Sequence, residues 1–188
     1  MEQTGPRQLL VKVARILDKL GIPYMVTGGI AVLVWGRPRF TADIDIVIQL
    51  KVESIKMLAS ELMKVSEFGY VDKDTMLEAL REHGEFNFIE GDTGVKVDFW
   101  VLDKETDELK RKAAKIVDDY SIYFISPEDL ILSKFRWHNK DASSRHIEDI
   151  ESVFKISGNK LDKKYLVKKS KSQEYEELLM NLIKKYSR

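Results

Sequence analysis

Residues 24–48 read YMVTGGIAVLVWGRPRFTADIDIVI, and the elements that they predict indicate the architecture of the chain. The apolar run at 24–27 predicts a short strand, Gly28-Gly29 predicts a tight turn, and the apolar run at 30–35 predicts a buried helix. Residues 43–48 begin with strict alternation and are rich in β-branched side chains, which predicts a second strand. A strand, a glycine turn, a helix and a further strand together indicate a sheet covered by helices.

The pattern continues on both sides of this stretch. Helical spacing of apolar residues predicts helices at 7–20, 53–66 and 74–81, and alternation predicts strands at 86–89, 95–101 and 122–125. A charged helix is expected around 105–115. Beyond residue 125 the pattern is helical, with a start at Ser126-Pro127, a helix to about 137, another from about 142 and a last one from 174.

We therefore expect an α/β (α+β) fold in which a small mixed β-sheet is flanked by helices. Residues 1–125 are expected to form the sheet domain and residues 126–188 a helical C-terminal lobe. The length of 188 residues fits one main core with a small accessory part.

Composition excludes several classes of protein. The chain has no cysteine, which excludes disulfide scaffolds, thiolate metal sites and cysteine nucleophiles. Its 31 basic and 31 acidic residues cancel, so binding to nucleic acid would need a local patch. The longest uncharged stretch, 22–36, is too short for a membrane helix and is broken by Pro23. We expect a cytoplasmic protein with no membrane contact.

Three aspartates point to chemistry. Asp43 and Asp45 lie two positions apart on one predicted strand, so both carboxylates should face the same side, where they repel unless a cation lies between them. Asp98 repeats the pattern on a later strand. Carboxylate oxygens suit Mg²⁺ or Mn²⁺. A solvated sheet face is the alternative for each acid alone, but Asp is a poor strand former and these strands are the most apolar of the chain.

Gly28-Gly29 lie where a strand turns into a helix. Backbone N–H groups and the positive end of the helix dipole at such a turn can hold a phosphate. A tight turn without a ligand is the alternative explanation.

These motifs, in this order, resemble the nucleotidyltransferases of the DNA polymerase beta superfamily. Gly28-Gly29 is followed by the thirteen residues 30–42, then by Asp43-Ile44-Asp45 and later by Asp98. Residues 37–43 (RPRFTAD) and 126–134 (SPEDLILSK) are similar to the small prokaryotic branch that includes the abortive-infection and toxin-antitoxin nucleotidyltransferases. The resemblance covers about residues 24–154.

The resemblance implies a metal-dependent enzyme that moves a nucleoside monophosphate from a triphosphate to a hydroxyl acceptor and releases pyrophosphate. Asp43 and Asp45 would bind the metal ions, and Asp98 would complete the metal site and help to deprotonate the acceptor. The nucleotide-binding residues would be Gly28, Gly29, Arg37, Arg39, Thr41 and Lys134. Ordinary surface cations are the alternative for the arginines and the lysine.

One position departs from the family pattern. Many active members have Ser after the first glycine, whereas this chain has Gly29 and then Ile30. The alternative function is therefore a degenerate nucleotidyltransferase that acts as a nucleotide- or protein-binding module of antitoxin type.

The C-terminal part is basic. Residues 155–171 contain seven Lys and one Asp. This segment could bind an RNA or protein acceptor, with a solvated helix face as the alternative. Arg145 and Asp149, four residues apart, are expected to pair along one helix.

Overall fold

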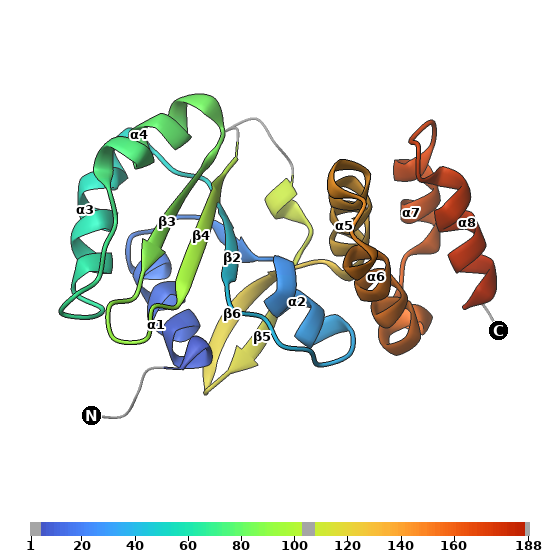
Figure 1. Ribbon diagram of the computed structural model, residues 1–188, viewed down its shortest axis with the longest axis horizontal. Coiled ribbons are helices and arrows are strands. Elements are labelled where there is room, and N and C mark those ends of the chain that lie inside the picture. The colour runs from blue at the N-terminus through green and yellow to red at the C-terminus, as the bar shows by residue number, and fades with distance from the viewer. Residues whose placement is uncertain (1–4, 103–107, 187–188) are drawn as a thin grey trace. The chain divides into compact units, whose positions relative to one another are not determined.

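A computed structural model describes residues 5–102 and 108–186, and it confirms the predicted α/β fold (Figure 1). The contacts divide the chain into two compact units. One contains the chain up to Ile30 and Phe40–Phe124, and the other contains Ala31–Arg39 and the chain from Ile125. The division into domains at residue 125 stays a prediction. Among the described residues, no helix has both the length and the apolar character needed to cross a membrane.

The first unit is built on a mixed sheet of six strands in the order β3-β4-β2-β1-β6-β5. The strands are β1 (Tyr24–Val26), β2 (Ile44–Ile48), β3 (Glu85–Ile89), β4 (Lys96–Val101), β5 (Lys112–Val117) and β6 (Tyr120–Ile125). Strand β2 pairs antiparallel with β1 and parallel with β4, while β3 and β4 form the predicted antiparallel hairpin. The two motif-bearing strands, β2 and β4, are therefore direct neighbours.

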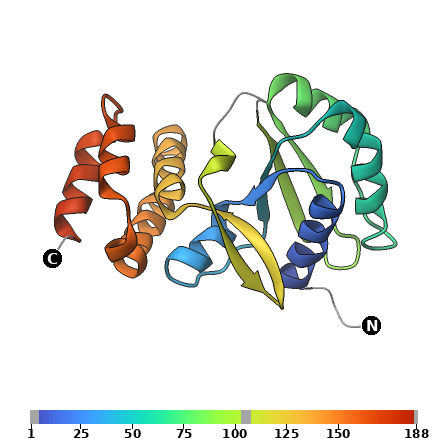
Figure 2. The ribbon, with the colours of Figure 1, turned by 180° about the vertical axis from the view of Figure 1, so that it is seen from behind.

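One face of this sheet is apolar. Ile46 of β2 lies opposite Phe99 of β4, which in turn lies opposite Phe86 of β3, and these side chains are almost fully buried. The helices of the unit are α1 (Pro6–Lys19), α3 (Val52–Met63) and α4 (Lys73–Glu82), and they lie together beside the sheet (Figures 1 and 2). Because side chains alternate along a strand, the polar residues of β2 and β4 all face the other side.

The predicted charged helix around 105–115 is wrong. A single 3₁₀ turn covers Glu108–Lys110, strand β5 begins at Lys112, and residues 103–107 lie outside the described part of the chain. Strand β5 forms a hairpin with β6 through Asp118 and Asp119, whose φ angles of 44° and 59° suit a tight two-residue turn. Lysines suit this strand because it lies at the sheet edge.

The second unit is helical. Its helices are α5 (Pro127–Asp141), α6 (Ser144–Ser157), α7 (Lys163–Ser170) and α8 (Glu176–Lys185), and it also contains the C-terminal part of α2 (Gly28–Trp35). The predicted helix start is confirmed, since the Ser126 side chain accepts a hydrogen bond of 3.1 Å from the Asp129 backbone N–H. Within this unit α5 contacts α6 and α7, and α8 contacts α6 and α7.

Helix α6 holds the segment 35–39 through its serines. The Ser157 hydroxyl donates to the Trp35 carbonyl over 2.6 Å, and the Arg37 backbone N–H donates to the Ser152 hydroxyl over 2.6 Å. A Cβ at Gly36 would overlap the Ser152 hydroxyl, so glycine permits this close approach. These contacts explain why the segment after α2 belongs to the helical unit.

Asp149 forms the charged centre of this unit. Arg39 reaches it with two N–H groups at 2.7 and 2.9 Å, and the Lys134 ammonium lies 2.9 Å from its Oδ2. The Asp149 side chain is 3% exposed. Burial by itself would raise the pKa of Asp149, but the hydrogen bonds and charges of Arg39 and Lys134 outweigh it and lower the pKa. Asp149 is buried on α6, where Arg39 and Lys134 reach it from other elements, and its pairing with Arg145 stays a prediction.

Replacing Asp149 by alanine should destabilise the fold by about 3–5 kcal/mol, because two largely buried cations lose their common counter-ion. Urea unfolding followed by circular dichroism measures this loss. Glu151→Ala is the matched control, since Glu151 lies on the same helix but pairs with Lys155 and Lys185 near solvent. The control should cost less than about 1 kcal/mol. Equal losses for the two variants would contradict the buried role of Asp149.

The difference in stability between wild type and Asp149→Ala should depend on pH. A carboxylate whose pKa is lowered by folding stabilises the protein above its unfolded pKa of about 3.9 and loses this effect as the pH falls through the folded value. The stability difference between wild type and Asp149→Ala should therefore be full at neutral pH and narrow below about pH 4.

Candidate active site

Two aspartates face each other across the polar side of the sheet. Strand β2 pairs in parallel register with β4, and Asp45 lies directly opposite Asp98. Neighbouring strands are about 4.8 Å apart, which is within the range where two charges interact strongly. Strand β3 continues the row, because Asn87 lies opposite Asp98 on its other side. The structure thus brings together two of the three predicted acids.

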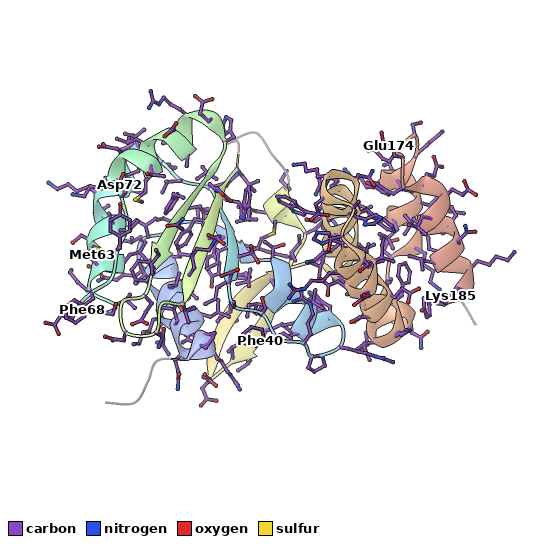
Figure 3. The ribbon with its side chains drawn as sticks, viewed as in Figure 1. Phe40, Met63, Phe68, Asp72, Glu174 and Lys185 are labelled. Carbon is purple, nitrogen blue, oxygen red and sulfur yellow. The ribbon has the colours of Figure 1, made fainter. Side chains whose placement is uncertain are left out.

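The third acid, Asp43, lies one residue before β2. Its carbonyl accepts a hydrogen bond of 3.4 Å from the Thr41 hydroxyl, so the predicted site residue Thr41 acts here on the backbone of the entry loop. Phe40, next to Thr41, has 85% of its surface exposed. Its place is labelled in Figure 3. Phe40 was not among the predicted site residues, although it lies within the motif at 37–43.

Gly28 lies against Asp45. It is the first residue of α2, its φ is 59°, and a Cβ at this position would overlap the Asp45 carboxylate. The preceding residue is fixed by a hydrogen bond of 2.9 Å from the Thr27 backbone N–H to the Asp45 carbonyl. Gly29 is the buried second residue of the helix. The glycine turn therefore brings a helix N-terminus next to an acid, with no side chain between them.

Lys96, which was not predicted as a site residue, lies beside one of these acids. The Lys96 ammonium lies 2.9 Å from Oδ2 of Asp98, two residues further along β4. Its hydrogen bond to Asp98 raises the pKa of Lys96 against the effect of burial, with smaller contributions from Asp43 and Glu85. Period-two alternation from Asp98 would have placed Lys96 on the same face, so the signal was present in the sequence.

The predicted phosphate-binding cations lie in the second unit. Arg37 is exposed and joins α6 through its backbone, whereas Arg39 and Lys134 share the Asp149 carboxylate. Lys134 has a side chain only 10% exposed and is therefore no ordinary surface lysine.

The polar face of the sheet that carries Asp45 and Asp98, called the acid face below, has the chemistry that suits a hard divalent cation. Its donors are carboxylate oxygens, and Gly28 adds no side chain that would block access to Asp45. In the described part of the chain, however, no three His, Cys, Asp or Glu side chains are grouped so that they could hold a metal ion. The Lys96 ammonium is the cation beside Asp98 in this arrangement.

The class of this protein follows from a family match, which is to the nucleotidyl transferases. The chain belongs to the family described as "Nucleotidyl transferase of unknown function (DUF2204)", which matches residues 7–186. This match confirms the predicted class. Among curated proteins, none matches the chain.

Solved structures share the fold at low sequence identity. ANT(2″)-Ia in complex with adenylyl-2″-tobramycin is 17% identical over 97% of this chain and 98% of that chain, with a TM-score of 0.56. The lincosamide antibiotic adenylyltransferase LnuA, bound to lincomycin, is 15% identical over 78% of this chain and 95% of that one, with a TM-score of 0.55. An antigenic nucleotidyltransferase-like protein from Paracoccidioides brasiliensis is 21% identical over 79% of this chain and 74% of that chain, with a TM-score of 0.54.

Replacing Gly28 by alanine should destabilise the protein more than the same change at Gly94. Both glycines have a left-handed backbone, with φ of 59° and 71°, so both variants lose about 1–2 kcal/mol from backbone strain. Only at Gly28 does the new methyl group collide with Asp45, whereas nothing lies within 4 Å at Gly94. Overpacking adds about 1–3 kcal/mol at Gly28. Urea unfolding of both variants measures the difference, and equal losses would contradict the contact between Gly28 and Asp45.

Proposed function

We propose that this protein is a metal-dependent enzyme that transfers a nucleoside monophosphate from a nucleoside triphosphate to a hydroxyl acceptor. The observation that carries the proposal is the register of β2 and β4, which sets Asp45 opposite Asp98 beside the Gly28 turn. At Gly28 there is no room for a Cβ next to the Asp45 carboxylate. A sheet face that only contacts solvent would not require a glycine so close to an acid. A phosphate-binding turn next to a pair of carboxylates does need this close approach.

In the proposed reaction the acceptor oxygen attacks the α-phosphorus of the triphosphate. A new O–P bond forms, the bond between the α- and β-phosphates breaks, and pyrophosphate leaves. Asp98 takes the proton of the acceptor hydroxyl as the general base. The backbone N–H groups of Gly28 and Gly29 would hold the β- and γ-phosphates, so that the reaction would not need the serine hydroxyl that this turn lacks.

Asp43 and Asp45 would hold the divalent cation, Mg²⁺ or Mn²⁺. Such an ion would supply neutralisation of the negative charge on the triphosphate oxygens. The chain's own contribution would be to hold Asp45 on the polar face of the sheet beside the glycine turn, with Asp43 two residues earlier at the entry to β2. Positioning and charge neutralisation supply most of the catalysis in reactions of this type.

Arg37, Arg39 and Lys134 are the cations proposed for nucleotide binding. Arg39, Lys134 and Asp149 together carry one net positive charge in a largely buried cluster, and Arg37 adds an exposed guanidinium on the same segment. These charges fit the predicted contacts with the triphosphate. Thr41 and the exposed ring of Phe40 lie on the entry loop of β2, where a nucleobase or an acceptor ring could stack on Phe40.

For the acceptor, the proposal is RNA or protein bound through the lysine-rich segment 155–171. Its support is the excess of lysine over acid in the segment, which contains α7. The motifs at 37–43 and 126–134 favour the abortive-infection and toxin-antitoxin branch, and the cytoplasmic location stays a prediction. ANT(2″)-Ia and LnuA were solved with tobramycin-derived and lincomycin ligands, so hydroxyl-bearing small molecules form a second acceptor class to test.

Two substitutions should separate the roles of the acids. Asp45→Asn should abolish Mg²⁺-dependent triphosphate binding in calorimetric titration. Asp98→Ala should keep most of the triphosphate affinity and lose about 10²–10⁴ in turnover, as expected for a general base. Asp92→Asn, an exposed acid of the β3–β4 loop, is the control and should change neither quantity.

Turnover is measured with α-labelled triphosphates and Mn²⁺, with pyrophosphate release counted in parallel. The acceptor pools are bulk RNA, co-purifying protein and hydroxyl-bearing antibiotics. Label that appears equally with Asp98→Ala would contradict the role of Asp98. Triphosphate binding without pyrophosphate release from any base or pool would favour the binding-module alternative.

A further inference from the structure

Lys96 occupies an unusual position for a lysine in a site expected to bind metal ions. Its ammonium lies 2.9 Å from Asp98 Oδ2, and the Asp98 side chain is 13% exposed. Alternation places Lys96 and Asp98 on the same face of β4, and Asp45 lies opposite Asp98 on β2. The alternation of side chains along β4 therefore places the Lys96 ammonium on the same face as Asp98.

The charge balance of the face supports a specific role for this ammonium. The Lys96 ammonium pairs directly with Asp98, and the charges of Asp43 and Glu85 make smaller contributions to the raised pKa of Lys96. A divalent ion on the same Asp98 oxygen would lie next to the ammonium, where two positive charges repel strongly. One of the two cations must therefore give way at Asp98.

We propose that Lys96 takes the place of a second metal ion at Asp98, so that the site binds one divalent cation, at Asp43 and Asp45. The inference rests on the proposed function and specifies its cation requirement. Lys96 is a positioning residue: its ammonium holds Oδ2 of Asp98 and keeps a metal ion off this oxygen, while the other carboxylate oxygen of Asp98 accepts the acceptor proton. The lysine stays charged throughout.

The test counts bound Mn²⁺ and does not depend on activity. Mn²⁺ alone is titrated into the full chain, and free Mn²⁺ is read from its electron paramagnetic resonance signal. Wild type should bind one Mn²⁺. Lys96→Met removes the charge and should bind a second ion, or the first about tenfold or more tightly, because a charge at this distance shifts such equilibria by a factor of ten or more. Lys96→Arg keeps the charge and should bind one ion as wild type does.

Two controls separate the inference from the proposed function. Lys19→Met removes a lysine that pairs with Glu61 at 2.7 Å between α1 and α3, and it should bind Mn²⁺ as wild type does. Asp45→Asn should lose the wild-type ion. Circular dichroism checks that each variant is folded.

The outcomes are distinct. Equal Mn²⁺ number and affinity in Lys96→Met and wild type, with binding still lost in Asp45→Asn, would overturn the role of Lys96 and leave the proposed function standing. A second ion in Lys96→Arg as well would show that charge is not the cause, and would also overturn it. Absence of Mn²⁺ binding in every protein would overturn the proposed function together with the inference.

Discussion

The pairing of β2 with β4 is the constraint on which the candidate site depends. A one-residue shift of this register would turn Asp98 to the face that buries Phe99, and the apolar side chains of β4 would face the polar side. The register is fixed by hydrophobic burial on the opposite face, where Ile46, Phe99 and Phe86 lie in one row. The apolar core thus determines which charges meet, although none of its atoms belongs to the site.

A second constraint acts within the helical unit, where Asp149 neutralises two cations from different elements. Arg39 comes from the segment before β2 and Lys134 from α5, so one carboxylate on α6 ties three parts of the chain together. A buried carboxylate of this kind stays charged because its partners are close and hydrogen-bonded. The cost of burying these charges is offset within the cluster, and the unit keeps a net positive centre.

Features that depend on residues close together in the sequence could be predicted. The glycine turn, the Asp43-Ile44-Asp45 strand entry and the helix start at Ser126 could be read from neighbouring residues, and the resemblance gave the enzyme class. Strand β5 was missed because Lys112–Val117 has no clean alternation, and only its pairing with β6 makes it a strand. The partners of Asp149 and the position of Lys96 beside Asp98 depend on burial and register, which a single sequence does not state. The catalytic and binding roles of the site residues stay predictions.

The hydrogen bonds that α6 makes to the segment 35–37 have a consequence for divergence. Ser157 and Ser152 recognise the carbonyl of Trp35 and the amide of Arg37, which every residue except proline at position 37 can supply. The residue at position 37 can therefore be substituted in the course of evolution while these two backbone hydrogen bonds are retained. The exposed side chain of this segment can thus change without any change to the contacts that hold its backbone on α6.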